Sequence, residues 1–147
     1  MSYANPIPVA VLLLPVDDGV LCVRRGGRTP SGAPEAGFGH LALPGGFVDV
    51  GETWQQAAAR ELREEANVYV EASAISDLCV RSTENGLVLL FGLGPSLTSA
   101  DLPPFSPSDE VTDRAIVRAA VSLAFPLHTE VVARHFAERQ PARRDSH

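Results

Sequence analysis

Three glutamates in one short segment of this sequence are spaced so that they could hold a metal ion. Residues 53–66 form an amphipathic stretch with an apolar residue at every fourth position, namely Trp54, Ala58, Leu62 and Ala66. This period predicts a helix. Helical residues advance by about 100°, so Glu61, Glu64 and Glu65 share one arc beside the apolar stripe. Carboxylates on a rigid helix edge are ligands that Mg²⁺ prefers.

The same segment could instead be an ordinary solvated helix face. Like charges three or four residues apart destabilise an isolated helix, and Arg60 is placed to pair with Glu64 on the next turn. Runs of charge are usually solvated faces. The spacing of residues outside the helix separates these two interpretations.

A fixed pattern surrounds the three glutamates. It consists of glycine, five residues, glutamate, seven residues, Arg-Glu-aliphatic, one residue, Glu-Glu, one residue, glycine and an aliphatic residue. The matching positions are Gly46, Glu52, Arg60, Glu61, Leu62, Glu64, Glu65 and Val68. This segment resembles the Nudix box of MutT-like members of the Nudix hydrolase superfamily. It departs from the pattern at Asn67, which replaces glycine. Because Asn tolerates positive φ, we expect Asn67 to end the helix and Asn67→Gly to be nearly silent.

The resemblance implies a metal site and a general base. Glu61, Glu64 and Glu65 would be metal ligands, joined by the main-chain carbonyl of Gly45. The general base would be Glu61, Glu64 or a glutamate outside the box. Glu110 is a further candidate for a ligand or base, with an exposed loop acid as the alternative. The implied cofactor is Mg²⁺, for which Mn²⁺ can substitute.

Three other box residues are expected to support this site. The resemblance groups Arg60 with the catalytic glutamates Glu61 and Glu64, where it would orient them by ion pairing rather than take part in the chemistry. Glu52 would tie the preceding loop to the helix, a structural role. Gly46 is expected to supply a backbone conformation that other residues rarely adopt.

Candidates for substrate contacts lie around a glycine-rich loop. Arg24 and Arg25 end a predicted strand and could reach a phosphate, although they could also be ordinary surface arginines. Phe38 and His40 could stack on a nucleotide base, with loop packing as the alternative for Phe38. His128 and His135 are expected to be ordinary helix residues.

The resemblance implies hydrolysis of a diphosphate linkage by attack of water at phosphorus. The substrate would be a nucleoside diphosphate derivative or a nucleoside triphosphate. A catalytically silent Nudix-type nucleotide-binding or regulatory module is the alternative function. The intact box glutamates and the lack of a helix-turn-helix segment in the sequence argue against it. A structural α/β domain with an accidental box is a third interpretation.

The remaining pattern predicts an α/β (α+β) fold, and the resemblance implies an α/β/α sandwich with a mixed β-sheet. We expect a hairpin from residues 7–15 and 19–25, a loop over residues 26–39, and a short strand broken at Pro44-Gly45-Gly46. Asn85-Gly86 predicts a second hairpin, from residues 76–82 and 87–93.

The C-terminal half is expected to contain a loop, a short strand and a helix. Residues 94–110 are rich in proline and serine and predict a loop. A short strand is expected over residues 115–117, and an amphipathic helix from Leu127. We expect a single domain over residues 1–140 and a disordered tail over residues 141–147.

Composition narrows the possible partners. The chain has 147 residues, 45% of them hydrophobic, and a net charge of −6. An acidic protein binds nucleic-acid polymers and anionic membranes poorly, so we expect a small nucleotide as partner. We expect the protein to be a monomer or homodimer.

The longest early apolar run is too short to span a bilayer, and we expect a cytoplasmic protein. Cys22 and Cys79 lie in apolar runs and are expected to be free thiols, with a disulfide between them as the open alternative.

Overall fold

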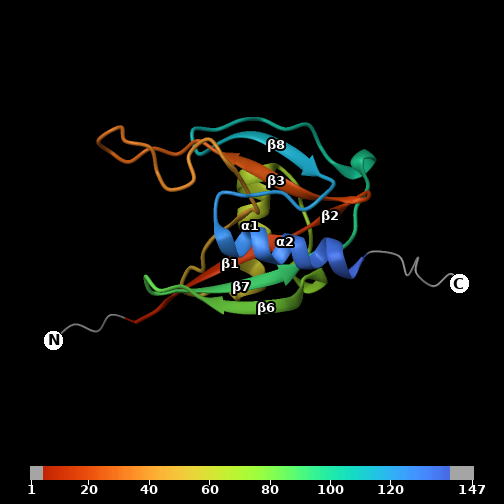
Figure 1. The fold of residues 1–147 in the computed structure, drawn as a ribbon, viewed down its shortest axis with the longest axis horizontal. Coiled ribbons are helices and arrows are strands. Elements are labelled where there is room, and N and C mark those ends of the chain that lie inside the picture. Colours follow the sequence, from red (N-terminus) through yellow and green to blue (C-terminus); the bar gives the residue numbers. More distant parts are fainter. Residues whose placement is uncertain (1–4, 140–147) are drawn as a thin grey trace, which may run out of the picture.

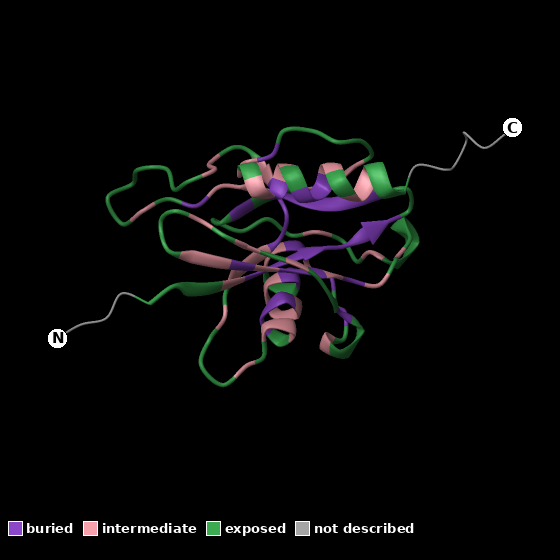
Figure 2. Ribbon diagram, turned by 60° about the horizontal axis from the view of Figure 1, so that its bottom comes forward, coloured by how far each residue is buried: buried purple, intermediate pink, exposed green. Residues whose placement is uncertain are grey.

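Two helices enclose two packed β-sheets in a computed structural model that describes residues 5–139 (Figure 1). The strands are β1 (Ile7–Leu13), β2 (Pro15–Val16), β3 (Gly19–Arg25), β4 (Leu41–Ala42), β5 (Gly45–Phe47), β6 (Ser76–Ser82), β7 (Leu87–Leu93) and β8 (Val111–Val117). The helices are α1 (Trp54–Ala66) and α2 (Pro126–Glu138), with short 3₁₀ turns at Ala72–Ala74 and Ser99–Asp101. Figure 2 shows α2 on one side of the strands and α1 on the other. The predicted α+β sandwich with a mixed sheet is therefore confirmed.

The first sheet is mixed and contains the strand that leads into α1. Its order is β5-β1-β7-β6, with β1 parallel to β7 and the other pairs antiparallel. The second sheet is antiparallel, with the order β2-β3-β4 and with β8 also paired to β3. Because β5 is an edge strand, one side of its backbone is free to face other groups.

The predicted hairpin over residues 7–15 and 19–25 is only partly right. Pro15–Val16 pairs with β3 across the turn at Asp17, whose φ is 53°. Residues 7–13, however, form β1 in the other sheet, between β5 and β7. A continuous buried apolar run is compatible with pairing on either side, so the sequence does not show where the chain changes sheets.

The break expected at Pro44-Gly45-Gly46 is shorter than predicted. Strand β4 ends at Ala42, and the chain resumes as β5 at Gly45, which lies opposite Val11 of β1. The two glycines are therefore strand residues rather than turn residues.

Helix α1 agrees closely with the predicted stretch of residues 53–66. The Thr53 hydroxyl accepts a hydrogen bond from the Gln56 amide, and the Gln56 side chain accepts one from the Thr53 amide, which forms a capping box. The apolar stripe is buried at Ala58, Leu62 and Ala66. This packing fixes the rotation of the helix, and with it the direction of the three glutamates.

The later elements also follow the sequence, with one difference. The predicted hairpin is β6 and β7, and Gly86 in its turn has a φ of 92°. The loops over residues 26–39 and 94–110 contain no strand, and the second includes the short 3₁₀ turn and an isolated bridge from Leu97 to Val16. Strand β8 begins at Val111, earlier than the expected 115–117, because it pairs with β3 over its whole length. The predicted C-terminal tail lies outside the described residues.

Two apolar clusters hold the layers together. One packs α1 against both sheets through residues such as Leu12, Leu21 and Leu62. The other packs α2 against the opposite face through residues such as Phe91 and Val132.

Both cysteines are free, as expected. Within residues 5–139 no helix has the length and apolar character needed to cross a membrane.

A buried histidine connects α2 to the segment that precedes β5. The Leu43 amide donates a hydrogen bond of 3.2 Å to Nδ1 of His128. His128 lies at 6% exposure between the rings of Phe91 and Phe125. Burial lowers the pKa of His128 to about 4, and the positive charge of Arg25 acts in the same direction. The neutral ring therefore fixes the chain immediately before Gly45.

Asn67 ends α1 in the left-handed conformation, with φ 61° and ψ 33°. Its side chain also makes a hydrogen bond that a glycine could not make. The Asn67 Oδ1 accepts a hydrogen bond of 2.7 Å from the Ser106 amide, which ties the end of the helix to the loop before β8. Arg114 of β8 adds a hydrogen bond of 2.8 Å to the Ala66 carbonyl. Asn67 is therefore a structural contact as well as a cap.

The His128 contact makes stability depend on pH. The unfolded histidine titrates near 6.5 and the folded one near 4, so the unfolded chain binds more protons between these values. We expect the free energy of unfolding to fall as pH drops from 6.5 to 4, by about 3 kcal/mol from this residue. Denaturant melts of wild type and His128→Gln across this range measure the effect. An equally steep pH dependence in His128→Gln would contradict it.

The Asn67 contact means that Asn67→Gly should not be silent, contrary to the expectation from the motif alone. Loss of the bond to Ser106 should lower the free energy of unfolding by about 1 kcal/mol. Asn67→Ala should cost about 1–2 kcal/mol more, because alanine must also adopt positive φ. Denaturant unfolding measures the order of stability of the two variants. Asn67→Asp is the control, because it keeps an acceptor oxygen. Equal stability of the alanine and glycine variants would show that the cap is unstrained.

Candidate active site

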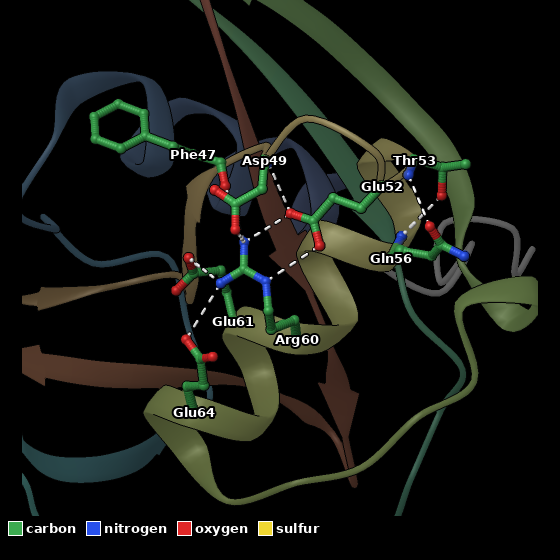
Figure 3. Close-up of polar contacts among 8 residues, drawn as sticks. All are labelled: Phe47, Asp49, Glu52, Thr53, Gln56, Arg60, Glu61 and Glu64. Carbon is green, nitrogen blue, oxygen red and sulfur yellow. Dashed lines mark hydrogen bonds and ion pairs between the residues drawn. The ribbon is translucent and has the colours of Figure 1, made fainter.

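Arg60 binds four carboxylates and one carbonyl at the centre of the segment that resembles the Nudix box (Figure 3). Its Nη2 lies 2.8 Å from Oε1 of Glu52 and 3.4 Å from Oδ2 of Asp49. Its Nη1 lies 3.0 Å from Oε2 of Glu61 and 3.3 Å from Oε1 of Glu64. These contacts join the loop before α1 to the glutamates on the helix through one planar guanidinium.

The same loop is closed by Glu52. Its Oε1 accepts a hydrogen bond of 2.8 Å from the Asp49 amide, and its Oε2 accepts one of 3.2 Å from Nε of Arg60. The hydrogen bond from Arg60, followed by that from Asp49, lowers the pKa of Glu52. Glu52 therefore stays ionised and lies between the loop and the helix.

Gly46 leaves room for one of the glutamates. Its φ does not lie in the left-handed region, so the expectation that it supplies an unusual backbone conformation is wrong. A Cβ at Gly46 would instead collide with the carboxylate of Glu61. The glycine is needed because the helix carboxylate sits directly against the face of β5.

The free edge of β5 faces the glutamates. The Gly45 amide donates a hydrogen bond of 3.1 Å to Oε1 of Glu65, and the Phe47 carbonyl accepts one of 3.1 Å from Nη2 of Arg60. In an antiparallel strand the N–H and C=O of one residue point to the same side. The carbonyl of Gly45 therefore points to the same edge as its amide, toward α1.

The glutamates carry more negative charge than their surroundings neutralise. Burial, followed by the neighbouring charge of Glu61, raises the pKa of Glu65 to about 8, while the hydrogen bond from the Gly45 amide lowers it. Burial likewise raises the pKa of Glu61, against the opposing effect of Arg60. Such raised values mark a place where a positive charge would be favourable.

The donor set suits a hard divalent cation. Glu61, Glu64, Glu65 and the Gly45 carbonyl offer only oxygen atoms, which Mg²⁺ and Mn²⁺ prefer. Within residues 5–139, no three acidic, histidine or cysteine side chains are already gathered as a metal cluster. The contacts explain this, because Arg60 holds Glu61 and Glu64 while the Gly45 amide holds Glu65. Glu64 is 53% exposed and can turn without disturbing the core.

The structure separates the candidate substrate contacts. Nε of Arg25 donates a hydrogen bond to the Ala36 carbonyl, its guanidinium lies 5.1 Å from the ring centre of Phe125, and its charge acts on Glu65. Arg24 is turned toward the Gly39 carbonyl and Asp113. Of the two arginines, Arg25 is the one that acts electrostatically on a box glutamate.

Among residues 5–139, three other candidates, Phe38, His40 and Glu110, make no side-chain hydrogen bond or ion pair with the box glutamates. The ring of Phe38 is covered by Arg28, at 4.4 Å from its centre, and His40 is exposed on the same loop. Glu110 is exposed, and no hydrogen bond or ion pair of its side chain occurs among the described residues. Its carbonyl accepts a hydrogen bond from the Gly26 amide, so its backbone has a structural contact.

Three features of the site were not predicted from the sequence: Asp49, Phe47 and the capping box. Asp49 shares Arg60 with Glu52, but nothing in its local sequence marks it. Thr53 and Gln56 do carry a local signal, since the pattern Thr-x-x-Gln before an apolar run is typical of a capping box. Phe47 directly follows the glycine pair, and the sequence does not indicate that its aromatic side chain is exposed.

Comparison with solved structures finds the same fold. A NUDIX hydrolase from Nitrosomonas europaea matches with a TM-score of 0.71 and 25% identity, over 94% of this chain and 74% of that one. A mutT/nudix family protein from Listeria innocua has a TM-score of 0.72 over 92% of this chain and 95% of that one, and its 20% identity supports the fold alone.

A third match is part of a larger enzyme. The bifunctional NMN adenylyltransferase/ADP ribose pyrophosphatase from Francisella tularensis has a TM-score of 0.63 and 25% identity, over 80% of this chain. This chain covers 35% of that protein's length. A second structure of that name, at 24% identity and a TM-score of 0.60, is a complex with AMP and a Mn ion.

The family profile named NUDIX domain matches residues 5–117, which include β1, the glutamate helix and β8. The match covers the elements that build the site as well as the box itself. The family profile therefore agrees with the arrangement of the carboxylates on α1 beside the edge of β5. The chain therefore belongs to the Nudix hydrolase superfamily, a class of pyrophosphohydrolase enzymes.

Proposed function

We propose that this protein hydrolyses a diphosphate linkage, with water attacking phosphorus and Mg²⁺ as the cofactor. The substrate class we infer is a nucleoside diphosphate derivative or a nucleoside triphosphate. One observation carries the proposal: Glu61 and Glu65 project from α1 to the free edge of β5, toward which the Gly45 carbonyl also points. A cluster of oxygen donors with unneutralised charge is what a phosphate-bridging cation requires.

The residues that would hold the cation are Glu61, Glu64, Glu65 and the Gly45 carbonyl. A bound Mg²⁺ or Mn²⁺ would neutralise phosphate charge and lower the pKa of a coordinated water. The raised pKa values of Glu61 and Glu65 support this assignment, because a cation would reverse the cost of keeping both ionised.

Arg60 prepares the carboxylates before substrate arrives. Its contacts to Glu52 and Asp49 fix the guanidinium at the loop, and its contacts to Glu61 and Glu64 aim those carboxylates at β5. Arg60 is therefore a positioning residue. The proton of the attacking water would pass to Glu61 or Glu64, with Glu64 the more exposed of the two.

Arg25 is the residue we propose for contact with a substrate phosphate. It acts electrostatically on Glu65, and within residues 5–139 its guanidinium makes one hydrogen bond, to a carbonyl, and one contact with an aromatic ring. A guanidinium can exchange such contacts for a bidentate bond to phosphate. Arg24, whose side chain is exposed, is the secondary candidate for this contact. Glu110 remains a candidate for a metal ligand or a general base, and a cytoplasmic location remains a prediction.

The substrate class is supported by a similar protein. The Francisella tularensis structure carries the name of an ADP ribose pyrophosphatase, an activity on a nucleoside diphosphate derivative. The carboxylate site here is exposed on one side at Glu64, so a substrate larger than a nucleotide could extend into solvent. We therefore place a nucleoside diphosphate derivative ahead of a nucleoside triphosphate.

The experiment that tests the proposal is a substrate panel with Mg²⁺. It includes nucleoside triphosphates, ADP-ribose, dinucleoside polyphosphates and nucleotide sugars, with products separated by chromatography. We expect at least one to be cleaved at a diphosphate linkage, and Glu64→Gln to lower kcat by about 100-fold or more. Glu130→Gln, on α2 in a surface pair with Arg81, is the matched control. A panel with no cleavage, or full activity in Glu64→Gln, would contradict the proposal.

A further inference from the structure

An exposed aromatic ring lies on the strand that carries the Gly45 carbonyl. The Phe47 side chain is 59% exposed, although the residue belongs to β5 and lies opposite Val9 of β1. Its carbonyl is held by Arg60, and Figure 3 shows its ring pointing away from that guanidinium. The backbone of Phe47 is thus fixed by the proposed active site, while its ring is left free.

The side of the sheet on which this ring lies follows from strand alternation. The missing Cβ of Gly46 faces Glu61 of α1, so Gly45 and Phe47 face the opposite side. The missing Cβ of Gly45 indeed approaches the side chain of Val11, which packs in the cluster beneath α2. Phe47 therefore lies on the α2 side of the first sheet.

Helix α2 covers only part of that side. Val11 and Leu89 are buried, but Val9 and Leu87 are only partly buried on the same side of the sheet. Beyond them Ile7, which lies opposite Leu87, is 49% exposed. Figure 2 shows this exposed beginning of β1. We call these four residues, Ile7, Val9, Phe47 and Leu87, the apolar shelf.

The apolar shelf shares strand β5 with the carboxylate site, although the two lie on opposite faces of that strand. Gly45 and Phe47 are two residues apart on one strand, which is about 7 Å. A flat sheet surface ending in a rigid aromatic ring suits a planar ring, because every nucleotide base has a face that can stack.

We infer that the apolar shelf binds the base of a nucleoside diphosphate derivative, with Phe47 as the stacking residue. The inference rests on the proposed function, since the phosphates of the same substrate would lie at the edge of β5. It makes Phe47 a residue that determines specificity. Stacking of one base on an aromatic side chain contributes about 1–3 kcal/mol, which corresponds to about 5- to 150-fold in affinity.

The test compares probes that differ only in the base. Binding of AMP, GMP, CMP and UMP is measured by calorimetry with Mg²⁺, beside ribose 5-phosphate, which has no base. The full chain is used as wild type, Phe47→Ala, Phe47→Trp and Tyr69→Ala. Tyr69 is the matched control, because it is 65% exposed and bonds only Glu71 among the described residues.

We expect at least one nucleotide to bind wild type about 5- to 150-fold more tightly than ribose 5-phosphate. Phe47→Ala should remove most of this difference and leave ribose 5-phosphate unchanged, while Phe47→Trp and Tyr69→Ala should keep it. Nucleotides that bind no more tightly than ribose 5-phosphate would overturn the inference. Equal weakening of all probes by Phe47→Ala would do the same, since it would indicate a structural role.

The experiments distinguish failure of the proposed hydrolase activity from failure of base binding at the apolar shelf. Glu64→Gln should retain the preference for nucleotides while it loses turnover of any diphosphate substrate. A base preference that depends on Phe47, in a protein that hydrolyses nothing, would reject the hydrolase and keep the apolar shelf as a base-binding surface. Turnover that is equally fast with and without Phe47, at substrate concentrations below KM, would reject the apolar shelf and keep the hydrolase.

Discussion

The guanidinium of Arg60 is the constraint on which the site depends, because several anionic groups would otherwise repel one another there. It binds Glu52 and Asp49 from the loop, Glu61 and Glu64 from α1, and the Phe47 carbonyl from β5. A planar fork with five N–H donors can satisfy partners in several directions at once, which a lysine cannot. The strand, the loop and the helix are therefore all held by one guanidinium. Arg60 does not contact Glu65 or the Gly45 carbonyl, so a bound cation could neutralise the charge there.

This arrangement divides the two faces of β5 between two tasks. The face toward α1 has no side chain at Gly46, so that Glu61 can approach the strand, and the free edge presents carbonyl groups. The opposite face carries Phe47 and continues into the partly covered start of β1. A short edge strand can thus hold charged phosphates on one side of its backbone and a planar apolar group on the other. From α2, His128 holds the segment immediately before β5 through the Leu43 amide.

Local signals explain what the sequence predicted. The period of four residues placed α1 correctly because its packing against the sheets requires an apolar stripe, and the spacing of the box placed Glu61, Glu64 and Glu65 on one edge. Long-range pairing explains what it missed. The apolar run before Asp17 is divided between two sheets, and β5 pairs with β1 more than thirty residues earlier in the chain. The role of Gly46 and the exposure of Phe47 depend on those pairings, so spacing alone could not supply them.

The most direct test of this account is a crystal structure of the protein grown with Mn²⁺, whose anomalous signal locates the ion. The account predicts an ion bound by carboxylates of α1 and by the Gly45 carbonyl, with at least one of Glu61 and Glu64 released from Arg60 to become a ligand. It also predicts that Arg60 keeps its contacts to Glu52 and to the Phe47 carbonyl. An ion bound away from β5, or no ion at a concentration that supports turnover, would contradict the central claim that this strand edge is the metal site.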